Sequence, residues 1–265
     1  MLKLKDVTLV AIDTRWPALA LKSIQRSMKK VDFGSVKLIH SREYHPDDVD
    51  IESCVIPHLL SAEDYSRFIL KNLIDYIETE YVLVTQWDSW VVDTSKWTDD
   101  FLSYDYVGAP WPNCAPSLSV GNGGFSLRSK ALLEFGAIAD FRKPHPEDVA
   151  IISQHNHLGS KSPISVAPLN LAKDFSFERP LLDDESLSSF RKAFGFHGLF
   201  NFPYFLTEEE LFDLLGSLPL STRESVEFWD LVEGHALDKS RLPWQPVKRV
   251  TGLGRLISKL KGFKL

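Results

Sequence analysis

The sequence is poor in cysteine and in long apolar runs, and its charge balance is not basic. Its two cysteines, Cys54 and Cys114, are too few for a disulfide framework and lack the spacing of a metal-binding motif. No uninterrupted apolar stretch is long enough to span a bilayer, and the opening "MLKLKDVTLVAIDTR" lacks the cleavage site of a signal peptide. The net charge of -6 argues against nucleic acid as the main partner, because phosphate binding normally uses a basic surface. We therefore expect a cytoplasmic protein that does not bind nucleic acid.

The residues that are present have the composition of a globular α/β protein. With 265 residues, 44% of them hydrophobic and 25% charged, the chain can bury a substantial core. Amphipathic stretches predict helices, including one opened by Pro17 and one capped by Ser61 with Asp64 in the capping-box position. The β-branched apolar runs predict strands at Val7–Ile12, Ser35–His40, Ile51–Ile56 and Tyr81–Val84. Strands that alternate with helices predict parallel crossovers and a covered central sheet.

A polar segment, "TQWDSWV", follows the last of these strands. In open α/β sheets, ligands bind beyond the carboxyl ends of the strands, and Asp88 falls at such an end. A carboxylate in this place can hold a divalent cation that is bound to a substrate diphosphate, because Mn²⁺ and Mg²⁺ prefer oxygen ligands. The alternative is a surface aspartate that caps a turn.

Three further segments carry possible chemistry, and each also has an ordinary structural interpretation. The glycines of "VGNGGFSLRS", Gly123 and Gly124 among them, indicate a loop that a bulky ligand can approach closely, or a simple turn. In "HPEDVAI", Glu147 or Asp148 could act as a general base, or both could complement the dipole of a helix that has Pro146 at its first position. In "FGFHG", His197 could ligate a metal or be a satisfied, partly buried histidine.

The order of these segments resembles the GT-A fold of glycosyltransferases. A carboxylate motif after a central strand, a glycine segment, an x-Glu-Asp helix start and a late histidine follow one another here. The text "YVLVTQWDSWV…YDYVGAPWP…VGNGGFSLRS…PEDVAI…FGFHG" is also similar to a poorly characterised family of glycosyltransferase-like proteins, over roughly residues 7–205. The resemblance implies a GT-A-type, Rossmann-like and mostly parallel sheet flanked by helices in residues 1–206. Residues 207–265 would then form a helical C-terminal extension.

The same resemblance implies a transferase that moves a sugar from a nucleotide-diphosphate donor, most readily a UDP-sugar, to a hydroxyl of a glycan or lipid-linked acceptor. Asp148, with Glu147 beside it, would be the base of an inverting reaction, and Asp88 and His197 would hold Mn²⁺ or Mg²⁺. The residues expected at the donor are Asp13, Thr14, Arg15, Lys71, Gln86, Trp87, Gly123 and Gly124. Those expected at the acceptor are Trp111, His145 and Phe196, and Trp90 is a further candidate for stacking on a sugar.

One position departs from the family pattern. The first acid of the usual Asp-x-Asp motif is Gln86 in this chain, and a neutral amide is a poorer metal ligand than a carboxylate. Asp88 is therefore the stronger metal candidate, and Gln86 could instead bond a ribose hydroxyl or a metal-bound water. The substitution keeps a second class of function open, a non-catalytic module that binds nucleotide sugars. A retaining transferase and a nucleotidyltransferase also remain open, although "AIDTRWPAL" lacks the glycine-rich loop that the latter favours.

The end of the chain differs from the rest in charge. Residues 248–265 carry six basic side chains and no acidic one, and their apolar residues fall on one face of a helical wheel. This pattern predicts a helix on an anionic membrane surface, at the inner face of the membrane, or a helix packed on its own domain with a solvated basic side.

Overall fold

The computed structural model describes residues 1–44, 46, 50–112, 114, 119–181, 192–235, 237 and 239–242. The chain divides into two compact units, Met1–Gly198 and Leu199–Leu265, which are described separately. The sequence places the division between residues 206 and 207. The predicted basic tail, 248–265, lies outside the described residues.

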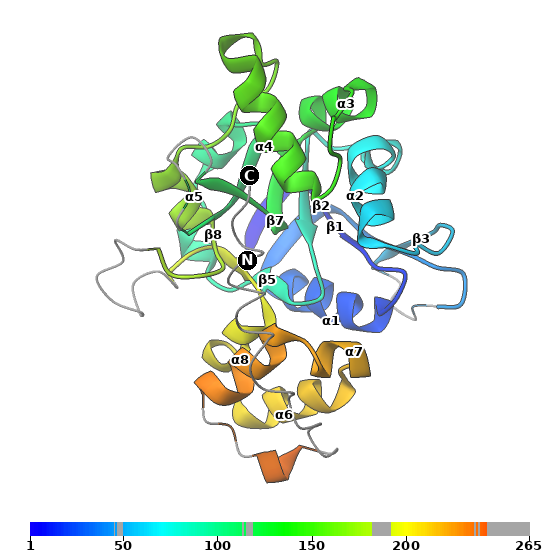
Figure 1. The fold of residues 1–265 in the computed structure, drawn as a ribbon, viewed down its shortest axis with the longest axis vertical. Helices are drawn as coiled ribbons and strands as arrows, with labels where there is room; N and C mark the ends of the chain where they lie inside the picture. Colours follow the sequence, from blue (N-terminus) through cyan, green and yellow to red (C-terminus); the bar gives the residue numbers. More distant parts are fainter. Residues whose placement is uncertain are drawn as a thin grey trace. The chain divides into compact units, whose positions relative to one another are not determined.

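A six-stranded mixed sheet forms the centre of the first unit (Figure 1). Its strands are β1 (Leu2–Ile12), β2 (Val31–His40), β3 (Glu52–Val55), β4 (Tyr81–Thr85), β6 (Tyr106–Pro110) and β7 (Val120–Ser129). They lie in the order β3-β2-β1-β4-β7-β6, with the first four parallel and β7 antiparallel to both of its neighbours. The prediction of a mostly parallel central sheet flanked by helices is confirmed, and this arrangement is consistent with a GT-A-type fold.

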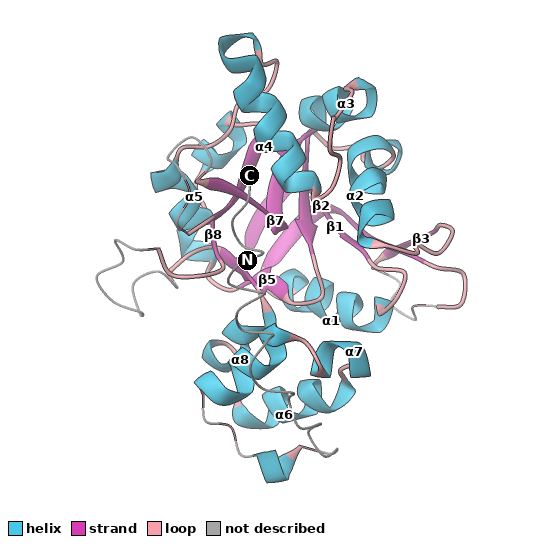
Figure 2. Cartoon of the chain, viewed as in Figure 1, coloured by secondary structure: helices cyan, strands magenta, loops and turns pink. Residues whose placement is uncertain are grey.

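Helices cover both faces of this sheet (Figure 2). They are α1 (Pro17–Met28), α2 (Ala62–Lys71), α3 (Lys130–Ile138), α4 (Glu147–Leu158) and α5 (Leu169–Phe175), with shorter turns η1 (Leu73–Tyr76), η2 (Thr94–Lys96), η3 (Asp99–Ser103) and η5 (Gly159–Lys161). Alternate strand residues face opposite layers. Leu9 packs in the layer that contains α1 and α5, and its neighbour Val10 packs in the layer that contains α2 and α3. This two-sided burial explains why the strands read as continuous apolar runs.

Local sequence signals fix the helix starts. Pro17 begins α1, and Ser61 accepts a hydrogen bond from the Asp64 backbone while Asp64 bonds back, so the predicted capping box is confirmed. The helix predicted at "HPEDVAI" begins one residue later than expected, because Pro146 is the N-cap and Glu147 is the first helical residue.

The region expected to be loop-rich, from Phe101 to about Ser129, contains two sheet strands, β6 and β7. Its end, "GGFSLRS", reads from the sequence as a strand that enters a helix at Lys130, and this part of the prediction is confirmed. The predicted glycine loop at Gly121–Gly124 is therefore wrong, because these residues lie within β7. The pairing of β7 with β6 shifts register between Asn122 and Ser126, which marks a bulge. Bulges interrupt the period-two pattern by which strands are read from sequence, and they often occur beside active sites, where they redirect side chains.

A second, three-stranded sheet has the order β5-β9-β8, formed by β5 (Ser89–Val91), β9 (Gly195–His197) and β8 (Ser176–Phe177). Its antiparallel β5–β9 pairing sets Ser89 opposite His197. This small sheet brings the late histidine next to the segment that follows β4.

The second unit is helical over its described residues. It contains η6 (Leu199–Tyr204), α6 (Glu208–Ser217), α7 (Leu220–Arg223), α8 (Val226–Gly234) and η7 (Lys239–Arg241), which confirms the helical segments expected beyond Thr207. Thr207 and Glu210 form a capping box at the start of α6. Among the described residues of the whole chain, we find no helix with the length and apolarity needed to cross a membrane.

Candidate active site

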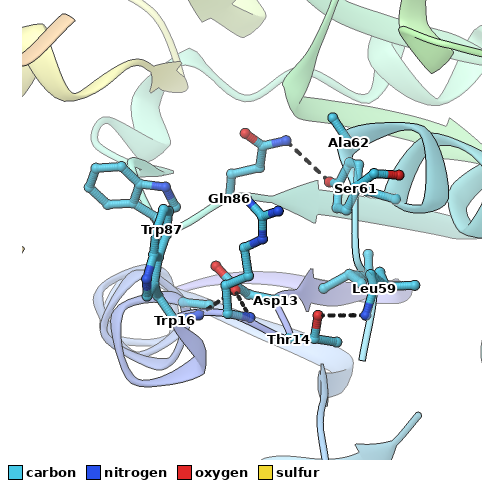
Figure 3. Close-up of a pocket in the computed structure, with 12 residues that line it drawn as sticks. Asp13, Thr14, Trp16, Leu59, Ser61, Ala62, Gln86 and Trp87 are labelled. Atoms are coloured by element: carbon cyan, nitrogen blue, oxygen red, sulfur yellow. Dashed lines mark hydrogen bonds between the residues drawn. The ribbon is translucent and has the colours of Figure 1, made fainter. Parts of the chain in front are cut away.

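A pocket of about 260 Å³ opens beyond the carboxyl ends of β1 and β4 (Figure 3). Trp16 and Trp87 form one side of it, with their rings edge to face and 6.4 Å between centroids, and Leu59 and Ser61 lie on the other side. The complete lining is Ile12, Asp13, Thr14, Arg15, Trp16, Ala20, Leu59, Ser61, Ala62, Tyr65, Gln86 and Trp87. This volume is slightly below the roughly 300–1,000 Å³ typical of small-molecule pockets.

The loop after β1 is held by hydrogen bonds from its own side chains. Asp13 Oδ1 accepts from the backbone N–H groups of Arg15 (2.8 Å) and Trp16 (2.6 Å), and Thr14 Oγ1 accepts from Leu59 N (3.0 Å). Burial raises the pKa of the Asp13 carboxyl, while these two backbone bonds act in the opposite direction. Five of the eight residues predicted at the donor, Asp13, Thr14, Arg15, Gln86 and Trp87, line this one pocket.

Gln86 connects the pocket to the predicted metal residues. Its Nε2 donates to the Tyr65 hydroxyl (3.2 Å), and its Oε1 lies 3.2 Å from His197 Nε2. Its backbone N–H donates to Gly124 O (3.0 Å), which attaches the segment after β4 to β7. The amide can donate at one end and accept at the other, which a carboxylate in its place could not do.

Asp88 and His197, the predicted metal pair, are brought together. His197 Nε2 is 3.5 Å from Asp88 Oδ1, and its Nδ1 is 3.6 Å from Glu178 Oε1. Burial favours the neutral ring, but the nearby charges of Asp88 and Glu178 raise the pKa of His197 well above its ordinary value. Glu178 Oε2 in turn accepts from Asn122 Nδ2 (3.0 Å). The imidazole therefore lies between two carboxylates, Asp88 near Nε2 and Glu178 near Nδ1.

The donor atoms around His197 Nε2 fit a divalent cation that takes the place of the proton on this nitrogen, because only a neutral imidazole nitrogen can bind a metal. Asp88 Oδ1 is buried and has no hydrogen-bond partner among the described residues, which leaves it available as a ligand. An ion with ligands at about 2.1 Å keeps adjacent ligand atoms roughly 3.0–3.4 Å apart, close to the 3.2 and 3.5 Å measured here. Within the described ranges, no group of three or more His, Cys, Asp or Glu side chains forms a complete metal site, so the substrate would have to supply further ligands.

Asp148, the predicted base, lies in the first turn of α4 next to the bulge of β7. Its Oδ2 accepts from Gly123 N (3.0 Å), and its Oδ1 accepts from the following backbone N–H of Val149 (2.7 Å). Burial and, secondly, the charge of Glu147 raise the pKa of the Asp148 carboxyl to about 6. A carboxylate with this pKa is mostly ionised at neutral pH and binds a proton more readily than an ordinary aspartate.

Glu147 is bonded to other side chains than Asp148 is, although both residues lie beside Gly123. It is buried, with 6% of its surface exposed, and its Oε1 accepts from Arg128 Nη2 at 3.3 Å. Its Oε2 accepts from Ser66 Oγ (3.2 Å), whose oxygen also lies 2.9 Å from His145 Nδ1. The structure therefore places Glu147 in a buried ion pair and His145 at the edge of the same network.

The glycines of β7 leave room for these side chains. A Cβ on Gly123 would lie 2.8 Å from Glu147 Oε1 and 3.1 Å from Asp148 Cβ, and one on Gly124 would overlap the His197 ring. A Cβ on Gly121 would meet the Trp111 ring at 2.5 Å. The space beside the glycines, which the sequence assigns to the donor, is thus filled by the candidate site residues themselves.

Three residues predicted in the site are held elsewhere. Lys71 donates to the carbonyls of Gly136, Ala137 and Ala139 at the end of α3. Trp90 and Phe196 pack edge to face, 4.6 Å between centroids, with 4% and 0% of their surfaces exposed. These contacts leave Lys71 bonded to another helix and leave Trp90 and Phe196 without a ring face for a sugar.

Five further residues contribute to the site but are not predicted there from the sequence: Trp16, Tyr65, Asn122, Arg128 and Glu178. Trp16 directly follows the predicted Asp13-Thr14-Arg15 stretch, so the same argument could have included it. Glu178 follows the two-residue strand β8, which is too short to recognise by periodicity, and its role depends on pairing between β8 and β9.

Comparison with known proteins places the chain in a family. The family model described as "Protein of unknown function (DUF5672)" matches residues 48–197, more than half of the chain, and the chain belongs to this family. The matched range includes Gln86, Asp88, Asp148 and His197, and the loop after β1 precedes it. No curated protein sequence matches the chain. Among solved structures, the chain is similar to a glycosyltransferase involved in glycosylation of the major capsid of PBCV-1, with a TM-score of 0.41 and 15% identity, covering 72% of this chain and 92% of that one.

Proposed function

We propose that this protein is an inverting glycosyltransferase that moves a sugar from a nucleoside-diphosphate donor to an acceptor hydroxyl. One observation carries the proposal: Gly123 contacts Asp148, and the adjacent Gly124 contacts His197. Because consecutive Cα atoms are about 3.8 Å apart, a candidate base and a candidate cation site contact neighbouring points of one strand. A base beside a diphosphate site is the arrangement that sugar transfer from such a donor requires.

The order in which these residues contact one another supports the assignment as a glycosyltransferase. The pocket beyond β1 and β4 leads through Gln86 to His197 and Asp88, and from there along β7 to Asp148. A donor with its nucleoside in the pocket would have its diphosphate near Asp88 and its sugar near Asp148. The aromatic side of the pocket suits a nucleobase, and a UDP-sugar is the donor class that we propose.

The chain's own residues have separable tasks in this reaction. Asp88, His197 and Gln86 would hold Mn²⁺ or Mg²⁺, which neutralises charge on a departing diphosphate when bound. Asp148 takes the proton of the acceptor hydroxyl while the acceptor oxygen bonds to the anomeric carbon. The bond from that carbon to the diphosphate oxygen breaks on the opposite face, which inverts the centre. Trp111 and His145 remain the acceptor-side candidates, and the acceptor is a glycan or a lipid-linked glycan.

A screen of nucleotide sugars with Mn²⁺, scored by thermal shift and by donor hydrolysis and transfer, tests the proposal. We expect Asp148→Asn to reduce transfer by about 10² to 10⁴-fold, the usual contribution of a positioned base, with nucleoside diphosphate binding unchanged. The anomeric configuration of the product, read by NMR, must be inverted. Near-wild-type turnover of Asp148→Asn, or a retained configuration, would refute the assignment.

A second candidate function is a module that binds nucleotide sugars without turning them over. The observation that favours it is the neutral Gln86, which bonds Tyr65 and lies beside His197 where the family pattern has an acid. Calorimetric titration of the donor, combined with the turnover assay, separates the two functions. Donor binding without hydrolysis or transfer, whichever divalent metal is added, would support the binding module.

A further inference from the structure

Arg128 on β7 is a fully buried cation, with 0% of its surface exposed. Its Nε donates to Ser126 Oγ (3.0 Å), its Nη2 donates to Glu147 Oε1 (3.3 Å), and its guanidinium carbon lies 5.5 Å from the centroid of the Tyr106 ring. Its Nη1 is buried without a hydrogen-bond partner among the described residues. Burying an ion pair is costly, and a well-packed apolar pair of similar volume is often at least as stable. Stability alone therefore does not explain why Arg128 and Glu147 are buried as a charged pair.

The pair lies between the strand and the helix that carry the candidate site. Arg128 belongs to β7, and Glu147 is the first residue of α4, directly before Asp148. The Gly123 N–H bond to Asp148 Oδ2 joins the same strand to the same helical turn. Since a Cβ on Gly123 would lie within 3.1 Å of the Arg128 guanidinium and 2.8 Å of the Glu147 carboxylate, the two attachments are packed against each other. The ion pair and the Gly123–Asp148 bond thus hold the same helical turn against the same strand.

The pair also supplies two charges that act on Asp148. Glu147 adds a negative charge on the same helical turn, and Arg128 adds a positive charge from β7. The other titratable groups that face this cluster are Tyr106 from β6, Tyr65 from α2 and His145, which reaches Glu147 through Ser66. Burial raises the pKa of both tyrosines, so they stay neutral at physiological pH.

We propose that the buried Arg128–Glu147 ion pair positions the candidate base, fixing the first turn of α4 against β7 and setting the proton affinity of Asp148. The proposal rests on the assignment of Asp148 under the proposed function. Its consequence is that the two members of the pair act on Asp148 with opposite sign. Removing the negative charge of Glu147 makes Asp148 bind protons more weakly, and removing the positive charge of Arg128 makes it bind them more tightly.

Three variants test this inference. Glu147→Gln should weaken proton binding by Asp148 about tenfold, Arg128→Met should strengthen it, and Arg128→Lys, which keeps the charge, should restore the wild-type affinity. The measurement is a ¹³C NMR titration of aspartate carboxyl groups, in which the Asp148 signal is identified by its absence from Asp148→Asn. The pH dependence of transfer, measured on the same proteins, should move in the same directions.

A matched control removes a cation far from this cluster. Lys96 pairs with Asp174 at 3.2 Å on the surface, and Lys96→Met should leave the Asp148 titration unchanged. If Arg128→Met does not fold because it leaves Glu147 buried and unpaired, the double variant Arg128→Met/Glu147→Gln replaces it. The double variant must bring the Asp148 titration back from the Glu147→Gln value toward higher pH.

The outcomes separate this inference from the proposed function. Shifts in the same direction, or no shift in either variant, would overturn the role of the ion pair even if the enzyme transfers sugar. Opposite NMR shifts in a protein that turns over no nucleotide sugar would support the electrostatic coupling and refute the proposed function. A loss of stability without any change in the Asp148 titration would make the pair purely structural and would also overturn the inference.

Discussion

Gly124 packs directly against the imidazole ring of His197, so that a side chain on this residue would overlap the ring. The contact joins β7 to β9, whose neighbour β5 follows directly after Asp88. The absence of a Cβ at residue 124 therefore determines where the His197 ring lies relative to Asp88 and Gln86.

We expect Gly124→Ala to displace His197 and to weaken binding of Mn²⁺ with a nucleoside diphosphate at least tenfold. Overpacking of this kind also costs about 1–3 kcal/mol of stability. Gly136→Ala is the matched control, because a Cβ there would lie 2.8 Å from Leu70 O in the contact between α2 and α3. The control should lose comparable stability and keep the binding, measured by calorimetry. Unchanged binding in Gly124→Ala would show that the ring position does not matter.

Gln86→Glu tests the departure from the Asp-x-Asp pattern. The change keeps the length of the side chain and puts a carboxylate 3.2 Å from His197 Nε2. We expect Mn²⁺ to bind several-fold more tightly, because a charged oxygen is a stronger ligand for a hard cation than an amide. Tyr65→Phe, which removes the hydrogen bond that the Gln86 Nε2 donates, should not have this effect. Weaker metal binding in Gln86→Glu, titrated by calorimetry at neutral pH, would contradict a cation site at Asp88 and His197.

The sequence allows the fold and one half of the candidate site to be predicted, for a physical reason. The segments 13–15 and 86–88 each directly follow an apolar run that reads as a buried strand, and parallel neighbouring strands end at the same edge of a sheet. β1 and β4 are such neighbours, and Asp13, Gln86 and Trp87 line one pocket. Signals that depend on the end of a strand thus identify residues that are far apart in the chain.

The other half of the candidate site depends on contacts between residues far apart in the chain, which no local sequence pattern indicates. Glu178 reaches His197 because β8 and β9 pair, and Asn122, beside the bulge of β7 at Gly123–Phe125, bonds to Glu178. Lys71 has the positive charge that a phosphate ligand needs, but its position on α2 directs its ammonium group to the carbonyl end of α3. Arg128 reads as an ordinary polar strand residue, and its burial is evident only from the packing of α4.

Trp16→Ala should weaken binding of a nucleoside diphosphate by about 10- to 100-fold, because stacking of a base on an aromatic ring contributes roughly 1–3 kcal/mol. Trp111 is outside the pocket and packs on Gly121, so Trp111→Ala is the control. The control should keep nucleotide affinity and raise the KM for the acceptor. Fluorescence or calorimetric titration of both variants checks the assignment, and equal loss of nucleotide affinity would refute it.

Deleting residues 248–265 tests the predicted membrane contact of the tail. These residues carry six positive charges and no negative one, and each basic residue near an anionic surface contributes about 1 kcal/mol at most. We expect the full chain to co-sediment with liposomes that contain phosphatidylserine, and the truncated chain to stay in the supernatant. Neutral liposomes are the control. Equal sedimentation of both chains would assign the binding to another part of the protein.

Asp148 should also make folding stability depend on pH in a defined direction. Because burial raises the pKa of this carboxyl from 3.8 to about 6, the folded state binds the proton more tightly than the unfolded state. The stabilisation from the protonated form is fully present below pH 3.8 and is lost as the pH rises through about 6. Asp148→Asn removes this loss, so the variant should become more stable than the wild type as the pH rises, by an amount on the order of 2–3 kcal/mol at neutral pH. Urea unfolding of both proteins between pH 4 and pH 8 measures the difference. A constant difference over this range would mean that Asp148 titrates as an ordinary aspartate, and its assignment as a base tuned by burial would then be wrong.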